Sequence, residues 1–404
     1  MNPPRRIAVV GAGLAALSTC DALRAHGYDG ELVLHSAERG LPYDRPPLSK
    51  DVLLGKARRD DVLLRPEQWY DDQRVSLREG TPVRAVRPGE GGLELADGTV
   101  EAADRVVLAT GGTPRALPVP GGGDDPAVHP LRTWEEAERL RERLLPGARV
   151  AVVGAGLIGA ETAAVACALG CRVVLIDPVA LPLAPVVGDD IAGVLHRRHT
   201  AEGIDVITAG VERLERRRAG VLVHLGGDRE SVAADTVVVG IGIRPATELA
   251  EAAGLVVDDG IVVREGRRTS HPRVFAVGDV ARSHGRRVRH EHWEAARRDG
   301  EAAASGLLGL PVPDPGAPWF WSDRHGSRLE AVGTMARAER TVLRGVPADG
   351  AFTAFGLRGD RVVAAAGIDR SRDVKAARRL VDRGVAVDAA RLADETVDLR
   401  ALLR

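Results

Sequence analysis

The chain contains 404 residues, of which 44% are apolar and 28% are charged, and its formal net charge is −1. This length is too great for one hydrophobic core, so we expect a globular protein of two or three domains. Nucleic acids and anionic membranes usually bind surfaces with a marked basic excess, and the balanced charge gives no reason to expect either partner.

The N-terminal segment places Arg5 and Arg6 before an apolar stretch, as a signal peptide does. The glycine spacing inside this stretch serves nucleotide binding instead, and the polar helix pattern that follows lacks a cleavage site. No apolar run in the sequence approaches the ~20 residues needed to span a bilayer. Three cysteines without a C-x-x-C pair fit a reducing compartment. We therefore expect a cytoplasmic protein with no membrane partner.

A short apolar strand is predicted at residues 7–10, directly before Gly11-Ala-Gly13-Leu-Ala-Ala16 and a helical pattern. In a dinucleotide loop of this form, Gly11 permits the tight turn and Gly13 lets backbone N–H groups approach a pyrophosphate. The small Ala16 allows the helix to pack closely on the strand. Such a motif is weak evidence when it stands alone, because glycine-rich turns often follow strands in α/β proteins.

Glu38 follows the next predicted strand and lies 22 residues beyond Ala16. An acid at this place accepts hydrogen bonds from an adenosine ribose, although a solvated loop glutamate is the alternative interpretation. Residues 41–50, LPYDRPPLSK, are too rich in proline for a helix or a central strand and predict an ordered loop. A buried strand at 105–108 then ends in small residues against which a nucleotide can lie, namely Ala109, Thr110 and Gly111.

The loop motif recurs 143 residues after Arg6, where the strand 149–153 leads into Gly154, Gly156 and Gly159. The strand that follows ends at Asp177, 18 residues beyond Gly159. A carboxylate there accepts both ribose hydroxyls and repels a 2′-phosphate, which predicts NADH rather than NADPH. Two dinucleotide units imply that one cofactor stays bound while the other comes and goes, an arrangement that serves hydride transfer.

The last part of the chain, from about Trp319, alternates short strand patterns with turns and has no nucleotide loop. A helix is predicted at 373–383, followed by a polar tail at 392–403. We expect this part to cover a bound cofactor and to offer a docking surface.

Several of these stretches resemble the FAD- and NADH-dependent ferredoxin reductases of bacterial P450 and ring-hydroxylating dioxygenase systems. The likeness covers nearly the whole chain, and its specific parts are the proline-rich loop 41–50 and the segment PWFWSD at 318–323. It implies an α/β fold like that of glutathione reductase, with two Rossmann-like dinucleotide-binding domains and a small α+β C-terminal domain. The implied boundaries are residues 1–113 and 241–317 for the FAD-binding domain, 114–240 for the NAD-binding domain and 318–404 for the C-terminal domain.

The resemblance also implies FAD and NAD as cofactors and gives roles to single residues. Lys50 is implied to point toward the flavin N5 and Glu161 to face it from the second domain, as a catalytic pair. Asp279 is implied to bind the ribityl chain, and Trp293 to lie against the isoalloxazine. The two loops, Glu38, residues 109–111 and Asp177 are already named as cofactor contacts. The resemblance implies four more, which are Arg45, Val83, Arg132 and Gly242. Each role has an alternative. Glu161 could be an exposed helix glutamate and Lys50 a loop lysine. Asp279 could belong to a strand-end turn, and Trp293 could simply pack in the core.

The three cysteines distinguish between related classes of flavoprotein. Disulfide reductases need two nearby cysteines, and peroxidase relatives need one reactive cysteine beside the flavin. Cys20, Cys167 and Cys171 all fall on predicted helices behind the glycine loops. Electrons are therefore expected to leave through the flavin edge, and the resemblance implies a ferredoxin–NAD(+) reductase with a [2Fe–2S] ferredoxin as acceptor. Rubredoxin as acceptor, direct oxidation by O₂ and an NADH-sensing flavoprotein remain alternatives.

A group of arginines near Trp293 is the predicted docking surface for an acidic carrier. Its members are Arg286, Arg287, Arg289, Arg297 and Arg298, together with the edge at residues 324–328. A solvated helix face is the alternative. His290 and His292 lack further ligands at a useful spacing, so we interpret them as structural and expect no metal.

Overall fold

A computed structural model describes residues 4–123, 125–286 and 288–403, and the chain divides into two compact units. The first unit comprises Met1–Asp44, Arg59–Thr113 and Ile243–Pro318, and the second comprises Arg45–Arg58, Pro114–Gly242 and Trp319–Arg404. The proline-rich loop is thus shared, with its second half grouped with the second unit. The finer domain boundaries expected from the sequence stay predictions.

The first unit is built on a five-stranded parallel sheet of order β19-β7-β1-β2-β3. Its strands are β1 (Arg6–Val10), β2 (Glu31–His35), β3 (Val75–Arg78), β7 (Arg105–Leu108) and β19 (Val274–Ala276). Alternate residues of β1 face opposite sides, so both faces of the sheet need cover. Ile7 and Val9 pack in the core with Leu17 and Leu307, whereas Ala8 and Val10 belong to a second core.

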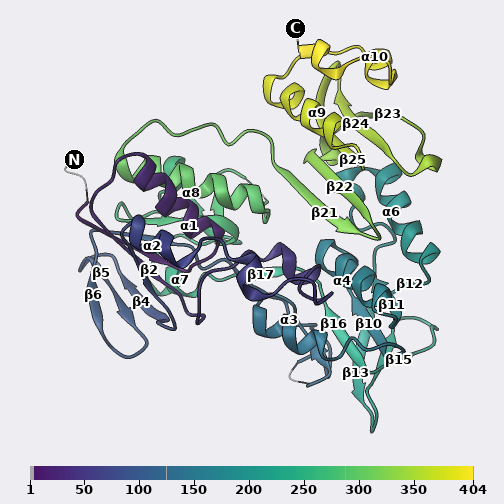
Figure 1. Ribbon diagram of the computed structural model, residues 1–404, viewed down its shortest axis with the longest axis horizontal. Helices are drawn as coiled ribbons and strands as arrows, with labels where there is room; N and C mark the ends of the chain where they lie inside the picture. The colour runs from purple at the N-terminus through teal and green to yellow at the C-terminus, as the bar shows by residue number, and fades with distance from the viewer. Residues whose placement is uncertain (1–3, 124, 287, 404) are drawn as a thin grey trace. The chain divides into compact units, whose positions relative to one another are not determined.

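Helices α1 (Leu14–Ala25) and α8 (Trp293–Leu308) carry Leu17 and Leu307 and lie alongside one another in the first unit (Figure 1). The opposite core includes Leu93, Ala250 and Ile261. Leu93 belongs to an antiparallel sheet of β4 (Val83–Arg87), β5 (Gly92–Leu95) and β6 (Val100–Ala102). Ala250 lies on α7 (Glu248–Ala252), and Ile261 begins β18 (Ile261–Val263), which pairs with β20 (Ala281–Ser283). The remaining elements are α2 (Glu67–Asp72), and β8 (Gly112–Pro114) paired with β17 (Ile243–Pro245).

The second unit contains another five-stranded parallel sheet, of order β12-β11-β10-β16-β9. Its strands are β9 (Val128–His129), β10 (Arg149–Val153), β11 (Arg172–Asp177), β12 (Asp205–Thr208) and β16 (Thr236–Val239). Here β10 lies between β11 and β16 as β1 lies between β2 and β7, and both loops follow the central strand. The sequence repeat is therefore a repeat of structure.

The helices of this part are α3 (Trp134–Arg141), α4 (Leu157–Ala168), α5 (Ala184–Val187) and α6 (Asp189–Ala201). A three-stranded antiparallel sheet accompanies them, made of β13 (Val211–Arg216), β14 (Val221–Leu225) and β15 (Val232–Ala234).

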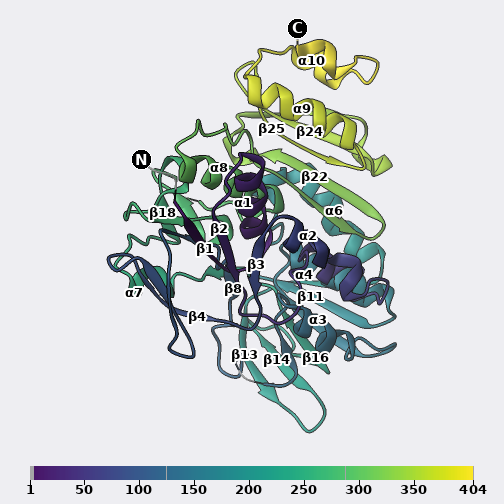
Figure 2. The ribbon, with the colours of Figure 1, turned by 60° about the vertical axis from the view of Figure 1, so that its left-hand side comes forward.

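The C-terminal part of the second unit is an antiparallel sheet of order β21-β22-β25-β24-β23. Its strands are β21 (Trp319–Arg324), β22 (Ser327–Gly333), β23 (Arg340–Arg344), β24 (Phe352–Arg358) and β25 (Arg361–Ile368). Figure 2 shows α9 (Ser371–Arg383) lying on this sheet beside β24 and β25, with α10 (Ala389–Ala393) beyond it.

The prediction of a polar tail at 392–403 was wrong. Leu392, Leu399 and Leu402 are buried, and the buried Arg344 donates hydrogen bonds to the backbone carbonyls of Leu392 and Asp394. These contacts bind the tail to β23.

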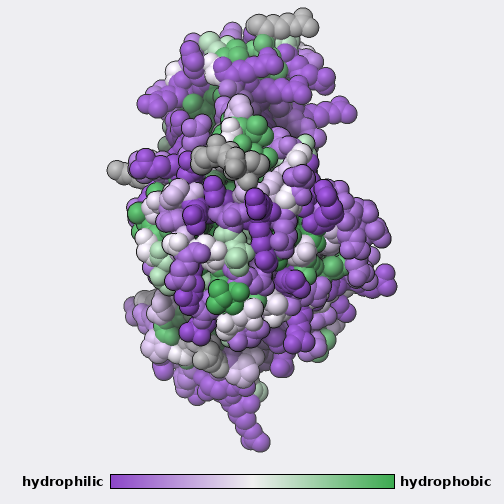
Figure 3. Space-filling model, turned by 90° about the vertical axis from the view of Figure 1, so that its left-hand side faces the viewer, coloured by the Kyte–Doolittle hydropathy of each residue, from purple (hydrophilic) through white to green (hydrophobic). Residues whose placement is uncertain are grey.

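The surface shows mixed character. On the face drawn in Figure 3, apolar residues occur as small separate groups among hydrophilic ones. Among the residues that the structure describes, no helix is both long and apolar enough to cross a membrane.

Candidate functional site

The first glycine loop joins β1 to α1 in a form that only glycine permits. Gly11 has a φ of 102°, and a Cβ at this position would lie 2.3 Å from the carbonyl oxygen of Ala109. A Cβ on Gly13 would meet no atom within 4 Å, so the space above it is open. Gly13 is also the N-cap of α1, where the first N–H groups of the helix point at the ligand position.

The carboxyl ends of three neighbouring strands meet beside this loop. Strand β7 ends at Ala109, whose carbonyl abuts Gly11, and the Thr110 hydroxyl donates to the Ala246 carbonyl over 2.8 Å. On the other side of β7, β19 leads into the turn that carries Asp279, which is half-buried. In parallel sheets, ligands bind at this edge. The structure thus places Gly11, Ala109, Thr110 and Asp279 at the carboxyl ends of neighbouring strands, and their roles as cofactor contacts stay predictions.

Asp299 of α8 holds the turn before Asp279. Its Oδ2 accepts the Gly278 N–H at 3.1 Å, and its Oδ1 pairs with Arg267 at 2.6 Å. Burial raises the pKa of Asp299 to about 6, while Arg267 and the Gly278 N–H oppose that shift. Our reading of the sequence missed Asp299, and nothing local distinguishes it from the other charged residues of α8, such as Glu294 and Glu301.

Three more predicted FAD contacts lie on the first unit. The Glu38 carboxylate is half-buried and accepts a hydrogen bond from the Tyr43 hydroxyl at 2.5 Å. The Trp293 indole N–H donates to Asp44, 3.0 Å from its Oδ1. Val83 begins β4 and is half-buried.

The second glycine loop, after β10, has the same construction. Gly154 has a φ of 100°, and its Cβ would lie 2.5 Å from the carbonyl oxygen of Gly240. Above Gly156 the space is open, whereas a Cβ on Gly159 would lie 1.9 Å from the Gly154 oxygen. Gly242, which follows β16, has a φ of 97° and is exposed. The loop is therefore shaped for a second dinucleotide.

Asp177 stands at the end of β11 beside this loop. Its Oδ2 accepts the Ala155 N–H at 2.8 Å and its Oδ1 accepts the Val179 N–H at 2.8 Å. Each carboxylate oxygen keeps a further lone pair, so the side chain is oriented by the backbone and can still accept from ribose hydroxyls.

Glu161 of α4 and Lys50 form a buried ion pair within the second unit. Lys50 Nζ lies 2.7 Å from Glu161 Oε2, and Glu161 is 2% exposed. The hydroxyls of Ser49 and Ser322 donate to its two carboxylate oxygens, over 2.5 Å to Oε2 and 2.7 Å to Oε1. A buried carboxylate is tolerated only when it is paired and hydrogen-bonded, and these three donors meet that demand. The two serines lie inside the motifs LPYDRPPLSK and PWFWSD, but our reading of the sequence did not single them out.

Arg45 and Arg132, the remaining predicted contacts, also meet in the second unit. The Arg45 guanidinium donates to the Arg132 carbonyl. Thr133 and Glu136 form a capping box at the start of α3, and Glu136 accepts the Arg132 N–H at 2.7 Å. The cap therefore orders the backbone that Arg45 contacts.

The cysteines do not form a redox centre. All three are free thiols, and burial raises the pKa of each, that of Cys20 to about 12. A thiolate is the reactive form, so these positions disfavour thiol chemistry. In the described part of the chain, no cluster of three His, Cys, Asp or Glu residues could hold a metal ion.

Most of the arginines of the predicted docking surface are paired with carboxylates, so the net positive charge of this group is smaller than the sequence suggested. Arg289 pairs with Asp259 and Glu291, Arg297 with Glu301, and Arg298 with Glu294. Arg286 is exposed, while Arg287 lies outside the described residues.

The prediction that the edge at residues 324–328 helps to dock the carrier was wrong for Arg324. Arg324 is buried inside the second unit and cannot contact a carrier from the edge at 324–328, whereas Arg328 is half-buried and pairs with Asp323 and Glu330.

Comparisons with known proteins agree over the full length. The sequence matches the pyridine nucleotide-disulphide oxidoreductase family over residues 5–300 and the reductase C-terminal family over residues 319–403. It is 44% identical over 402 residues to the ferredoxin–NAD(+) reductase component of the anthranilate 1,2-dioxygenase system of Burkholderia cepacia, covering 98% of each chain. It is 37% identical over 413 residues to putidaredoxin reductase of Pseudomonas putida, covering 100% of this chain and 98% of the relative.

Solved structures give the same result. The covalent putidaredoxin reductase–putidaredoxin complex matches with a TM-score of 0.94 and 36% identity, covering 100% of this chain and 98% of that chain. The ferredoxin reductase for the CYP199A2 system from Rhodopseudomonas palustris also has a TM-score of 0.94, with 33% identity, covering 99% of this chain and 100% of that chain.

Proposed function

Because the chain belongs to the pyridine nucleotide-disulphide oxidoreductase family, we propose that it is a ferredoxin–NAD(+) reductase that passes electrons from NADH through FAD to an iron–sulfur protein serving an oxygenase. The comparisons confirm the predicted α/β fold class, the oxidoreductase activity, the cofactors FAD and NAD, and a ferredoxin-type partner. Free thiols fit a reducing compartment, so we place the activity in the cytoplasm.

The observation that carries this function is the duplicated loop. In each unit a glycine of positive φ brings the loop against a neighbouring strand end, and the next glycine leaves open space at a helix N-terminus. The residues present therefore fit a dinucleotide in each unit. We assign FAD to the loop at Gly11 and Gly13, and NADH to the loop at Gly154 and Gly156.

The chain's own residues prepare the reaction by orienting charge. When bound, FAD takes a hydride from NADH and passes its electrons on singly. The Lys50 ammonium lies 2.7 Å from the buried Glu161 carboxylate and also donates to the Pro46 carbonyl at 3.2 Å. Ser49 and Ser322 hold the carboxylate in the orientation that faces Lys50. In this proposal Lys50 and Glu161 are the catalytic pair, as the resemblance to the family implies.

Coenzyme selection rests on Asp177. Its two oxygens are held by the loop and by the start of the next segment, so it cannot turn away from a 2′-phosphate. Repulsion between the two anions therefore favours NADH.

The experiment is steady-state reduction of cytochrome c through an added [2Fe–2S] ferredoxin, with NADH or NADPH as donor. We expect a yellow protein whose NADH-driven rate depends on the ferredoxin. Reduction of ferricyanide, which needs no specific docking, is the control. Oxidation of NADH in air at a rate unaffected by the iron–sulfur protein would overturn the assignment in favour of an oxidase, and transfer only to rubredoxin would change the acceptor.

A further inference from the structure

A buried arginine at the end of β21 has no carboxylate of its own. Arg324 is 6% exposed, and among the described residues its Nε and Nη2 have no hydrogen-bond partner. Glu161 is the acid whose charge acts on it, but that carboxylate is already bound by Lys50, Ser49 and Ser322. An unpaired guanidinium out of water is strongly unfavourable unless something else supplies an acceptor.

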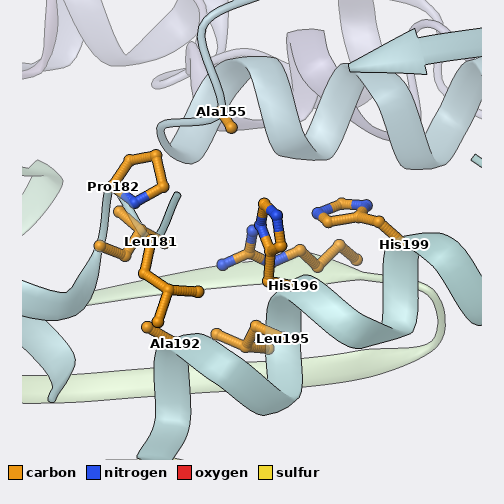
Figure 4. Close-up of a pocket in the computed structure, with 9 residues that line it drawn as sticks. Ala155, Leu181, Pro182, Ala192, Leu195, His196 and His199 are labelled. Atoms are coloured by element: carbon orange, nitrogen blue, oxygen red, sulfur yellow. The ribbon is translucent and has the colours of Figure 1, made fainter. Parts of the chain in front are cut away.

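The Arg324 side chain lines a pocket within the second unit. Figure 4 shows His196 pointing from α6 into the space beside Ala155, Leu181 and Pro182, with His199 one turn further along the helix. Apart from Arg324 and the two histidines, the wall is apolar. About 10 Å³ is open to the centre of a water molecule, which is the room that one water or one small ion needs.

The groups around this pocket favour negative charge. Burial lowers the pKa of Arg324 to about 10, which leaves it charged at neutral pH. Arg198 lies near it and has a second buried nitrogen, Nη1, without a hydrogen-bond partner among the described residues.

The histidines add no counter-charge. Burial together with Arg324 lowers the pKa of His199 to about 3, so the ring is neutral, and its Nδ1 lies 2.8 Å from His325 Nε2. Asp177 is the acid whose charge acts on His196 from the loop side, and the backbone N–H groups that donate to both its oxygens offset part of that charge.

We propose that this pocket binds a small monovalent anion of halide size, held by the unpartnered nitrogens of Arg324. A water molecule can accept a hydrogen bond from the guanidinium but leaves its charge uncompensated.

The first test is thermal unfolding of the full chain at constant ionic strength, with sodium chloride or bromide replaced stepwise by sodium gluconate. A ligand that binds only the folded chain stabilises it by RT ln(1 + [L]/Kd), so above Kd the melting temperature rises with the logarithm of the ligand concentration. We expect the halides to raise the melting temperature in this way. The variant Arg324→Gln should lose this dependence, and Arg328→Gln, an arginine of the same unit with carboxylate partners, should keep it. An equal halide effect in Arg324→Gln overturns the proposal.

The second test does not depend on any variant. Crystals of the full chain grown in sodium bromide are expected to show an anomalous bromide peak within hydrogen-bonding distance of Arg324. A water at that position overturns the proposal. Loss of the peak on soaking with NADH also overturns it, because the acceptor is then a phosphate oxygen of the coenzyme and not a free ion.

Discussion

Gly159 and Gly156 lie three residues apart in the second loop, yet alanine at the two positions is expected to fail for different reasons. A Cβ on Gly159 would lie 1.9 Å from the Gly154 oxygen. Gly240 is also close, since a Cβ added to it would lie 3.2 Å from the Gly159 Cα. The methyl group therefore forces α4 away from β10 or distorts the turn. A Cβ on Gly156 meets nothing within 4 Å and its φ is −68°, so the fold accepts it.

The magnitudes separate the two variants. Overpacking in a closely packed site costs about 1–3 kcal/mol, which exceeds the gain of about 1 kcal/mol from replacing glycine by alanine within a helix. For a unit of this size, each kcal/mol lowers the melting temperature by about 2–4 °C. We expect Gly159→Ala to melt several degrees lower, and Gly156→Ala to melt like the wild type.

The assay pairs differential scanning calorimetry with NADH binding. In Gly156→Ala the added methyl occupies the place that the coenzyme pyrophosphate approaches, so we expect its Kd for NADH to rise at least about tenfold, with FAD content unchanged. The reasoning is refuted if Gly159→Ala melts at the wild-type temperature, or if Gly156→Ala binds NADH normally.

Four further outcomes are expected. Replacing Asp177 by alanine, with an arginine introduced nearby, should reduce the preference for NADH over NADPH, measured as the ratio of their kcat/KM values. Changing all three cysteines to serine or alanine should leave ferredoxin-dependent cytochrome c reduction within several-fold, because the raised pKa of each thiol disfavours the reactive thiolate. Ser322→Ala removes one donor to the buried Glu161 carboxylate, so it should lower the free energy of unfolding by about 1–3 kcal/mol, measured by denaturant titration, with Ser327→Ala as control. The folded-state pKa of Asp299, about 6, lies above its ordinary 3.8, so its contribution to stability is complete below 3.8 and lost as pH rises through 6. The melting temperature of the wild type relative to Asp299→Asn should therefore fall as the pH rises from about 4 to about 6 and change little above that.

Each of these outcomes has a clear contrary result. Equal rates with NADH and NADPH in the wild type would remove the role of Asp177. Loss of activity in a folded cysteine-free chain that retains flavin would restore a thiol mechanism. Unchanged unfolding of Ser322→Ala would mean that the Glu161 carboxylate needs only Lys50 and Ser49. A flat difference curve for Asp299→Asn would show that Arg267 fully offsets the burial of the carboxylate.

Features that depend on a few consecutive residues could be predicted from the sequence. The two loops are of this kind, because the turn after a parallel strand needs glycine wherever φ is positive or a backbone passes close by. Asp177 was placed by counting from Gly159, because the strand–helix–strand unit has a nearly constant length. The same local logic gave the family resemblance, since LPYDRPPLSK and PWFWSD are continuous stretches.

Only the tertiary structure decided which distant side chains share a buried space. Ser49, Glu161 and Ser322 come from three separate segments, and nothing local marks the two serines as partners of a carboxylate. Arg324 and Arg344 read as surface charges, yet the C-terminal sheet buries both. The physical reason is that a polar or charged side chain can be buried wherever distant backbone or side-chain groups satisfy it, and those groups are set by the packing of whole elements and not by the adjoining sequence.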